Sequence, residues 1–281
     1  MPPQHDRRLR PGEAGAPPAR KRWGQHFLAR PETAERIVDA SRVSGDDLVL
    51  EVGPGDGALT RPLSRKAGRV VAVEIDPLRA GRLREELGDA GRVAVLTGDV
   101  MQRTFREWLV AGGGQGPAVM VANLPYNAAT RILTAAIEDP ETIRRAVATV
   151  QAEVADRFLA KPGDEGYGYL SVRTAAHATG RRLFDLPPGA FRPRPRVDST
   201  VMELTPRPHP VTDAESLKGA LRLASLGFRA RRKTLANALS SAGPRAQWER
   251  LLEAIGKTPR ARAEELSLED FVRLARSAVP A

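Results

Sequence analysis

The sequence contains no cysteine, and only 4 of its 281 residues are histidine. Disulfide bonds, thiolate metal ligands and a cysteine nucleophile are therefore excluded, and no metal site is expected. No apolar run approaches the roughly 18 residues of a membrane span, and the N-terminus lacks an apolar signal region. We therefore expect no export and no contact with a membrane. The absence of cysteine fits a reducing compartment, so the expected location is cytoplasmic.

The sequence also contains fewer acidic than basic residues. Lys and Arg number 44 against 34 Asp and Glu, which gives a net charge of +10 at pH 7. Such an excess favours a polyanionic partner through phosphate contacts and counterion release, although a generally basic proteome gives the same composition. With 41% hydrophobic residues, the chain can form one large α/β domain, alone or with a smaller second domain.

The N-terminal region divides into two parts. Residues 1–19 are rich in Pro, Gly, Ala and Arg without periodicity, which predicts a disordered basic arm. Residues 22–28 then interleave basic and aromatic side chains around a glycine. Within them, His26 is a candidate base or ligand, but a polar residue lining a pocket is the favoured interpretation. Apolar spacing predicts an amphipathic helix over 31–43.

Two buried strands then end in groups suited to a small cofactor. Residues 47–52 run into Gly53-Pro54-Gly55, where glycine lets the backbone bend tightly and approach a ligand. A helix is expected over 58–66. The strand over 69–76 ends in Glu74, which is placed to accept both hydroxyls of a ribose. The glycine spacing is not that of the dinucleotide fingerprint, so this turn alone leaves the cofactor class open.

The acids that follow complete the series. Asp76 is placed to cap a helix over 77–87, and a third strand over 93–100 ends in Asp99, an acceptor for an adenine amino group. Each acid alone is an ordinary strand-end residue. Three strand ends that each deliver a suitable group predict a nucleoside cofactor at one edge of a sheet.

A fourth apolar strand, residues 118–121, leads into Asn123-Leu124-Pro125-Tyr126. The Asn123 amide can accept and donate hydrogen bonds, and the Leu124 carbonyl ahead of ring-locked Pro125 is a second fixed acceptor. The Tyr126 phenol offers a face for stacking. These groups suit an exocyclic amine of a planar heterocycle, held so that its nitrogen attacks an electrophile. The alternative is an ordinary strand-ending turn.

The rest of the large domain contains a proline-stiffened loop over 187–199. The loop presents Phe191, which either sandwiches an extruded base together with Tyr126 or anchors the core. Its neighbours Arg192 and Arg194 are candidates for phosphate contacts. The other elements expected here are helices over 128–137 and 153–159 and strands over 146–150, 183–186 and 197–204.

A proline-rich linker over 206–210 predicts a boundary between a domain at 20–207 and a helical domain at 208–281. The expected helices of this second domain are 214–225, 232–240, 247–255 and 268–277. Its basic cluster is either a solvated surface or, as favoured here, a binding site for an RNA backbone. The cluster consists of Arg229, Arg231, Arg232 and Lys233.

In this order and spacing, the motifs resemble the small-subunit (16S) ribosomal RNA adenine N6,N6-dimethyltransferases of the KsgA type. The resemblance extends from about residue 20 to the C-terminus. The segments that carry it are 21–28, 51–55, 73–76, 98–99, 123–127, 151–154, 167–172, 187–191, 193–199 and 231–234.

The resemblance implies a Rossmann-like methyltransferase sheet with a small all-α C-terminal domain that binds RNA. It implies S-adenosyl-L-methionine as the cofactor. The implied target is two adjacent adenosines near the 3′ end of small-subunit rRNA in an assembling particle. We expect a monomer.

The implied site residues fall into two groups. For the cofactor, the resemblance implies a lid that contains His26 and Leu28, and Gly53 and Gly55 at the methionine moiety. It also implies Glu74 at the ribose and Asp99 at the adenine. Asn123 is implied as a further cofactor-binding residue. Those for the target are the catalytic amide of Asn123, Leu124 and Pro125 around the amine, and the stacking pair Tyr126 and Phe191.

Two positions depart from the family pattern. Arg131 stands where the family usually has proline, and Ala152 stands where it has lysine, which affects fine positioning of the substrate rather than the class. One rival is the large-subunit (23S) rRNA adenine N6-methyltransferase that confers macrolide resistance, disfavoured by segments 167–172 and 231–234. The other is a non-catalytic RNA- or DNA-binding assembly or transcription factor on the same fold. A generic NAD-binding domain lacks the required glycine spacing.

Overall fold

The computed structural model describes residues 26–87 and 91–278. The arm expected at residues 1–19 lies outside these ranges. Within them, a seven-stranded sheet runs in the order β4-β3-β2-β5-β6-β9-β7, and a separate ladder joins β1 to β8. Pairing is parallel from β4 to β6 and antiparallel where β9 meets β6 and β7. The strands are β1 (Phe27–Leu28), β2 (Leu48–Val52), β3 (Arg69–Glu74), β4 (Val93–Thr97), β5 (Ala118–Asn123), β6 (Ile143–Gln151), β7 (Ala178–Leu186), β8 (Phe191–Arg192) and β9 (Ser199–Pro206).

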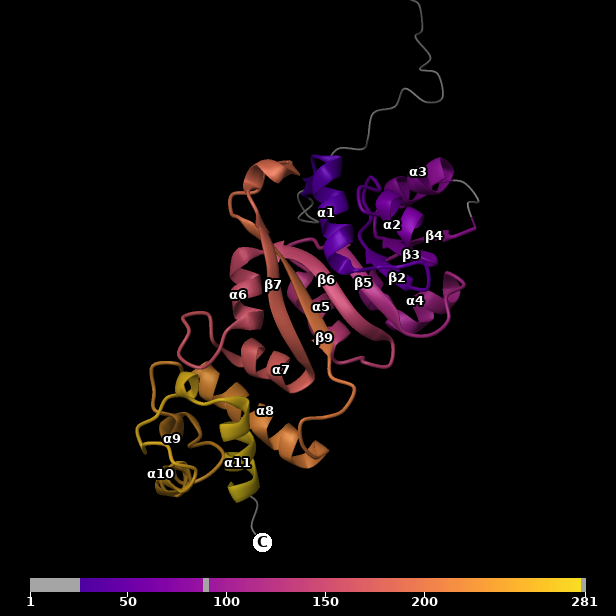
Figure 1. The fold of residues 1–281 in the computed structure, drawn as a ribbon. Coiled ribbons are helices and arrows are strands. Elements are labelled where there is room, and N and C mark those ends of the chain that lie inside the picture. Colours follow the sequence, from indigo (N-terminus) through magenta and orange to yellow (C-terminus); the bar gives the residue numbers. More distant parts are fainter. Residues whose placement is uncertain (1–25, 88–90, 279–281) are drawn as a thin grey trace, which may run out of the picture.

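Helices cover both faces of the sheet (Figure 1). Helices α1, α2 and α3 pack on one face, and α4, α5 and α6 pack on the other. The helices are α1 (Pro31–Ser41), α2 (Thr60–Lys66), α3 (Pro77–Leu87), α4 (Phe105–Ala111), α5 (Ala129–Ile137), α6 (Ala152–Leu159), α7 (Tyr169–His177), α8 (Ala214–Arg229), α9 (Leu235–Ala238), α10 (Arg245–Ala254) and α11 (Leu268–Ala278). Helices on both faces explain why the inner strands are apolar without alternation.

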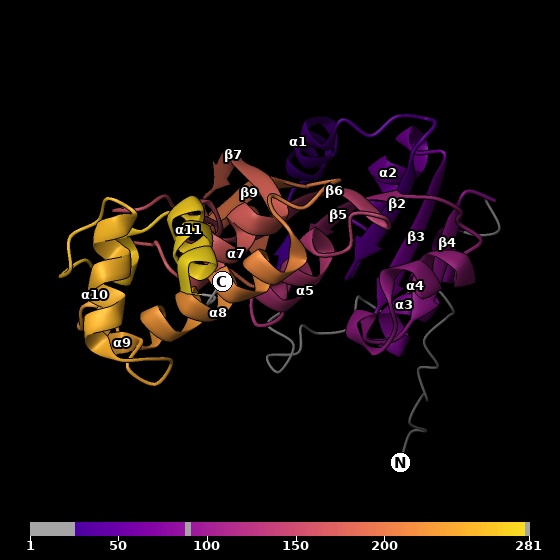
Figure 2. The same cartoon turned by 90° about the horizontal axis from the view of Figure 1, so that it is seen from below.

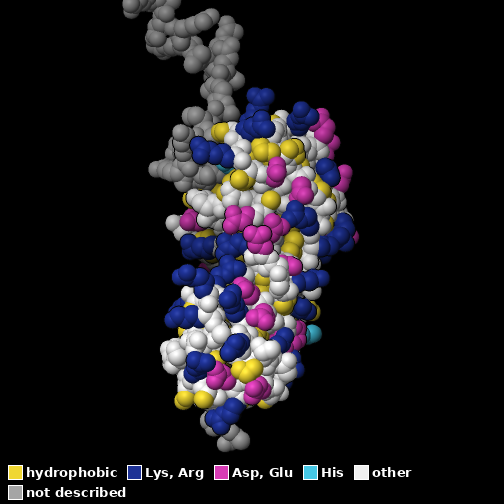
Figure 3. All heavy atoms as spheres, turned by 90° about the vertical axis from the view of Figure 1, so that its left-hand side faces the viewer, with side chains coloured by type: hydrophobic (Ala, Val, Ile, Leu, Met, Phe, Trp, Pro, Cys, Tyr) yellow, Lys and Arg dark blue, Asp and Glu magenta, His cyan; other side chains and the backbone are white. Residues whose placement is uncertain are grey.

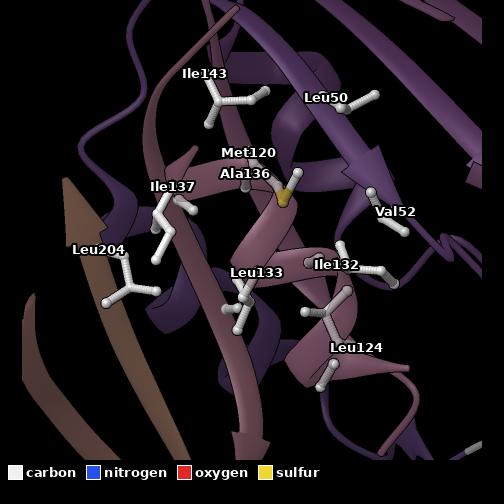
Figure 4. Close-up of a cluster of buried hydrophobic side chains, with 14 of the residues drawn as sticks. Leu50, Val52, Met120, Leu124, Ile132, Leu133, Ala136, Ile137, Ile143 and Leu204 are labelled. Carbon is white, nitrogen blue, oxygen red and sulfur yellow. The ribbon is translucent and has the colours of Figure 1, made fainter. Parts of the chain in front are cut away.

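The core also positions the loop that follows β5. Leu124 is only 2% exposed and belongs to the same buried cluster as Met120 of β5 and Ile132 of α5. Figure 4 shows these side chains with Leu133 in the layer between the sheet and α5. Because the Leu124 side chain is embedded in this cluster, the backbone on either side of it is held against the edge of the sheet.

Helices α8 to α11 form a second cluster at the opposite end of the molecule from β4 (Figure 2). Its core includes Trp248, Phe271 and Leu274, and Val172 of α7 packs into it from the sheet side. Helix α7 therefore connects the two parts of the structure. None of the helices in the described ranges is long and apolar enough to cross a membrane.

The predicted α/β architecture with a helical C-terminal region is confirmed, and several element boundaries differ. The helix expected over 232–240 is reduced to Leu235–Ala238, and β7 begins at Ala178 rather than at 183. Helices α4 and α7 were not predicted. The apolar residues of α7 pack against α8 and its neighbours, a contact that has no signature in the local sequence.

Candidate active site

The strand order reverses between β2 and β5, which is where an open α/β sheet is expected to form a ligand-binding crevice. From β2 the chain moves outward to β3 and β4, and it then returns to β5 on the other side of β2. In open α/β sheets, ligands bind outside the carboxyl ends of strands at such a reversal. Gly53 follows β2, and Asn123 ends β5. The two segments are close, because a side chain added at Gly53 would contact Pro125 at 4.0 Å.

The glycine turn after β2 is tied to Glu74 at the end of β3. Gly53 and Gly55 have φ values of 69° and 57°, a backbone conformation that favours glycine. The Gly55 N–H donates a hydrogen bond to one oxygen of the buried Glu74 carboxylate, and the Asp76 N–H donates to the other, each at 2.9 Å. Burial raises the pKa of Glu74, and the two N–H donors oppose that rise. The carboxylate is therefore held rigidly at the crevice.

The next two acids also lie at the ends of strands. Asp76 accepts a hydrogen bond from the Leu78 N–H at 3.0 Å, which confirms its predicted capping role at α3. Asp99 accepts from the Met101 N–H at 2.9 Å with one carboxylate oxygen. Its adenine-binding role stays a prediction.

A buried acid that was not singled out lies beside this group. Glu51 of β2 is 1% exposed, and burial raises its pKa to about 8, with Thr60 lowering it and Glu74 raising it further. One of its carboxylate oxygens has no hydrogen-bond partner among the described residues. The sequence did contain a sign that Glu51 is unusual, because it is the only acid within the otherwise apolar residues of β2.

The β1 segment crosses the Asn-Leu-Pro-Tyr loop. The Asn123 side-chain amide donates a hydrogen bond to the His26 carbonyl at 2.8 Å. The His26 ring stacks on Tyr126, with centroids 5.0 Å apart and planes inclined by 29°. His26 Nδ1 donates to the Pro193 carbonyl at 2.7 Å, and the Tyr126 hydroxyl is bonded to Ser199 at 2.6 Å. The structure thus places His26 beside Asn123 and Tyr126, and its role in lining a ligand site stays a prediction.

Phe27 lies over the glycine turn. A Cβ atom added at Gly55 would lie 2.7 Å from the Phe27 ring, so this approach requires glycine. The Arg79 guanidinium lies 4.2 Å from the centroid of the same ring and forms an ion pair with Asp56. The Arg79 side chain is only 1% exposed. Neither Phe27 nor Arg79 was among the predicted site residues.

Phe191 lies in a different environment from the one predicted. It is 2% exposed, its backbone pairs with Leu28 in the β1–β8 ladder, and its ring packs in the core beneath α1. That burial matches the alternative interpretation of Phe191 as a core anchor. In this arrangement the ring on Tyr126 is His26, and stacking of Phe191 on a base stays untested.

The Leu124 carbonyl is an available acceptor. No described residue donates a hydrogen bond to it, whereas the carbonyl of the next residue, Pro125, accepts from the N–H groups of Ala128 and Ala129 at 3.0 Å each. Asn123 and Leu124 thus offer two acceptor oxygens on one anchored segment. Arg131 is exposed on α5, and Ala152 begins α6.

The predicted RNA-binding residues form two groups rather than one. Arg192 and Arg194 are exposed at β8 and the loop that follows it. Arg229, Arg231, Arg232 and Lys233 are exposed at the end of α8 and just beyond it. Arg231 also donates to the Tyr167 carbonyl at 3.3 Å.

A cleft of about 1280 Å³ lies between the sheet domain and α8, and Arg157, Arg173 and Arg231 are among its lining residues. Lys and Arg side chains gather across the middle of the face in Figure 3, with Asp and Glu side chains among them. The cleft is not purely basic, because Glu153, Asp156, Asp164 and Glu165 also line it.

The chain is similar to known proteins over most of its length. The family described as "Ribosomal RNA adenine dimethylase" matches residues 17–279. The "Ribosomal RNA small subunit methyltransferase A" of Geobacter metallireducens is 40% identical over 262 residues, covering 92% of this chain and 95% of that protein.

Two solved structures extend the comparison. The crystal structure of the 23S rRNA methyltransferase ErmE is 28% identical with a TM-score of 0.70, covering 89% of this chain and 98% of that one. A dimethyladenosine transferase from Plasmodium falciparum has a TM-score of 0.73 at 23% identity, covering 89% of this chain and 96% of that one, and supports the fold alone.

Proposed function

Because the chain belongs to the ribosomal RNA adenine dimethylase family, we propose that it transfers methyl groups to N6 of two adjacent adenosines near the 3′ end of small-subunit rRNA. The product is N6,N6-dimethyladenosine, and the methyl donor is S-adenosyl-L-methionine. The observation that carries this proposal is the pair of acceptor oxygens on Asn123 and Leu124, held at the crevice between β2 and β5.

The residues at the crevice fit this cofactor. Gly53 and Gly55 allow a ligand to approach the backbone, and Glu74 and Asp99 offer carboxylate oxygens for ribose hydroxyls and an adenine amine. The unpartnered carboxyl oxygen of Glu51 adds an acceptor at the same edge, suited to a cationic ligand. His26 and Leu28 then belong to the lid.

When bound, S-adenosyl-L-methionine supplies an activated methyl carbon, so the protein needs to position the attacking amine. The Nδ2 donor of Asn123 is bound to the His26 carbonyl, which leaves Oδ1 to accept an N–H of the target. The Leu124 carbonyl accepts the second N–H, and together they turn the nitrogen lone pair toward the methyl carbon. Most of the lowering of the barrier then comes from orientation.

The same arrangement serves a second round of transfer. A monomethylated amine carries one N–H, which needs only one of the two acceptors. Tyr126 supports the flat face of the base, its hydroxyl fixed by Ser199. Pro125 keeps the Leu124 carbonyl in place, since its ring restricts the backbone.

The finer assignments follow from the same proposal. Residues 208–281 form the RNA-binding domain, with Arg229, Arg231, Arg232 and Lys233 on phosphates and Arg192 and Arg194 contacting RNA near the site. The substrate is the rRNA of an assembling small subunit. The protein works as a monomer in the cytoplasm.

The second candidate is methylation of 23S rRNA, favoured by the structural likeness to ErmE. The higher identity to a small-subunit enzyme, 40% against 28%, favours the 16S target. A binding role without catalysis does not explain why the two acceptor oxygens and the crevice acids occur together.

The deciding experiment supplies labelled S-adenosyl-L-methionine with under-methylated small subunits and, in parallel, with 23S rRNA, and then maps the label. The expected product is dimethyladenosine in the 3′-terminal hairpin of 16S rRNA, absent with the Asn123→Ala variant. Label in 23S rRNA alone would transfer the assignment to the second candidate. No label in either RNA, with the cofactor still bound, would overturn the catalytic proposal.

A further inference from the structure

A groove runs along the outer face of α8, away from the active site. Its volume is about 690 Å³, within the roughly 300–1,000 Å³ typical of ligand sites. The α8 residues that line it recur at helical spacing and so share one face, while Ala220, Leu223 and Ala224 bury the opposite face. Tyr169 of α7 and Pro210 line the groove from outside α8.

The floor of the groove is apolar and its rim is cationic. Leu217, Leu221 and Leu226 are partly buried along it, and Lys218, Arg222 and Arg229 are exposed beside them. None of the residues lining the groove is Asp or Glu. Such a surface complements a ligand that combines flat apolar groups with repeated negative charge.

The three rim cations are also unpaired. Within the described part of the chain, the side chains of Lys218, Arg222 and Arg229 form no ion pair or hydrogen bond. Of the other ten Lys and Arg residues in the described helical region, half are paired with carboxylates. Those are Arg245, Lys257, Arg262, Arg273 and Arg276. All three rim charges are therefore available to bind phosphates beside the apolar floor.

We propose that this groove binds an unpaired nucleotide of the RNA substrate, its base on the leucine floor against Tyr169 and the adjoining phosphates on Lys218, Arg222 and Arg229. Unpaired bases recognised by proteins commonly stack on aromatic side chains, with basic residues along the backbone. Tyr169 also lines the large cleft that contains Arg231, so a strand leaving the groove enters that cleft.

This inference rests on RNA as the substrate, and it adds a base-binding site remote from the reacting adenine. It predicts that the enzyme reads single-stranded RNA beside its target through α8. A duplex cannot place a base in the groove and uses only the cationic rim.

The test measures binding to the full chain of a fluorescent hexa-uridylate and of a short blunt-ended RNA duplex, which has no unpaired base. Ser225→Phe fills the groove without removing charge, because Ser225 lines it between Arg222 and Arg229. We expect affinity for the hexamer to fall about tenfold, the order of one lost base contact, with an unchanged salt dependence. Affinity for the duplex should stay the same.

Charge variants give the complementary result. Lys218→Ala and Arg222→Ala should each weaken hexamer binding and lower the slope of log affinity against log salt by about 0.7. Arg250→Ala, which removes an exposed cation of α10 outside the groove, is the matched control and should bind like the wild type.

Cross-linking decides the case if Ser225→Phe misfolds. A hexamer of 4-thiouridine, irradiated with the wild-type chain, should label peptides containing Tyr169 or residues 217–226. Label confined to other peptides, or wild-type hexamer affinity in a folded Ser225→Phe variant, would overturn the proposal.

If that variant loses only transfer to protein-containing particles, the groove binds an acidic protein segment instead. Wild-type methyl transfer is measured separately, so failure of the groove leaves the enzymatic proposal intact.

Discussion

The side-chain amide of Asn123 donates a hydrogen bond to the backbone carbonyl of His26 at 2.8 Å, which joins the end of β5 to the segment that crosses it. The bond fixes the orientation of the amide, since its N–H group is used and its oxygen stays available. The residue proposed to hold the target amine is thus positioned by the proposed cofactor lid.

Replacing Asn123 should separate cofactor binding from catalysis. Asn123→Ala removes one acceptor for the amine, and we expect the turnover number to fall about 10²–10³-fold, a loss typical for one positioned hydrogen-bonding group. Affinity for S-adenosyl-L-methionine, measured by calorimetry, should change only severalfold, because Glu74 and Asp99 are untouched. Gln115→Ala, which removes an exposed amide from the loop at the other end of β5, is the control. Unchanged turnover in Asn123→Ala would remove the assigned role.

Two substitutions of Tyr126 should separate the contribution of its ring from that of its hydroxyl group. Tyr126→Phe loses the bond to Ser199 and keeps the stacking face, so transfer should stay within a fewfold of wild type. Tyr126→Ala loses the face, and the loss of about 1–3 kcal/mol of stacking should lower kcat/KM roughly 10- to 100-fold. Equal losses in both variants would show that the hydroxyl, rather than the ring, carries the function.

The strand-end residues of the site were predictable from sequence because parallel strands place their carboxyl ends at one edge. Gly53, Glu74, Asp99 and Asn123 each end or follow an apolar run, and the structure brings those runs side by side. The chain order of motifs was therefore enough to predict their proximity.

Contacts that depend on tertiary packing were not predictable in the same way. The β1–β8 ladder is two residues long and joins segments more than 160 residues apart, so it has no periodic signature. Arg79 reads as a surface residue of an amphipathic helix, yet its guanidinium is covered by Phe27 and paired with Asp56. The prediction for Phe191 used its proline-rich setting, whereas its burial depends on the contact with Leu28.

Arg79 should affect the binding of S-adenosyl-L-methionine indirectly, because it holds the Phe27 ring over the glycine turn. Arg79→Met keeps the volume but removes the ion pair and the cation–π contact, and the remaining Asp56 is 41% exposed and can be solvated. A desolvated cation–π contact contributes about 2 kcal/mol, so KM for S-adenosyl-L-methionine should rise roughly 30-fold with little change in kcat. Arg65→Met, which removes an exposed ion pair with Glu35, should leave KM unchanged. A fall in kcat alone would contradict the link to Phe27.

Glu51 should make the stability of the unliganded protein depend on pH. Its pKa is about 8 in the folded chain against 4.5 ordinarily, so between these values the folded state binds more protons than the unfolded state. The free energy of unfolding therefore falls as pH rises from about 5 to 8. Glu51→Gln cannot ionise. The free energy of unfolding of this variant should therefore exceed that of the wild type by an amount that grows across this pH range, to the order of a few kcal/mol.

Thermal melts at pH 5, 6.5 and 8 measure the effect, with Glu35→Gln as the control for loss of an exposed carboxyl group. An advantage of Glu51→Gln that is constant with pH would mean that Glu51 is already ionised in the folded state. Addition of S-adenosyl-L-methionine should reduce the advantage, because a cationic ligand stabilises the ionised carboxylate.

The basic segment after α8 should contribute salt-dependent affinity for RNA. Arg231, Arg232 and Lys233 are exposed, and Arg231 extends to the Tyr167 carbonyl at the cleft. Replacing all three with alanine removes up to three phosphate contacts, so the slope of log affinity against log salt should decrease by about 2–3. Fluorescence anisotropy with a small-subunit rRNA fragment between 50 and 200 mM salt measures this slope.

Since these residues lie outside the crevice, affinity for S-adenosyl-L-methionine should stay at the wild-type value. A parallel loss of affinity at every salt concentration, with the slope unchanged, would mean that the segment shapes the domain without touching phosphates.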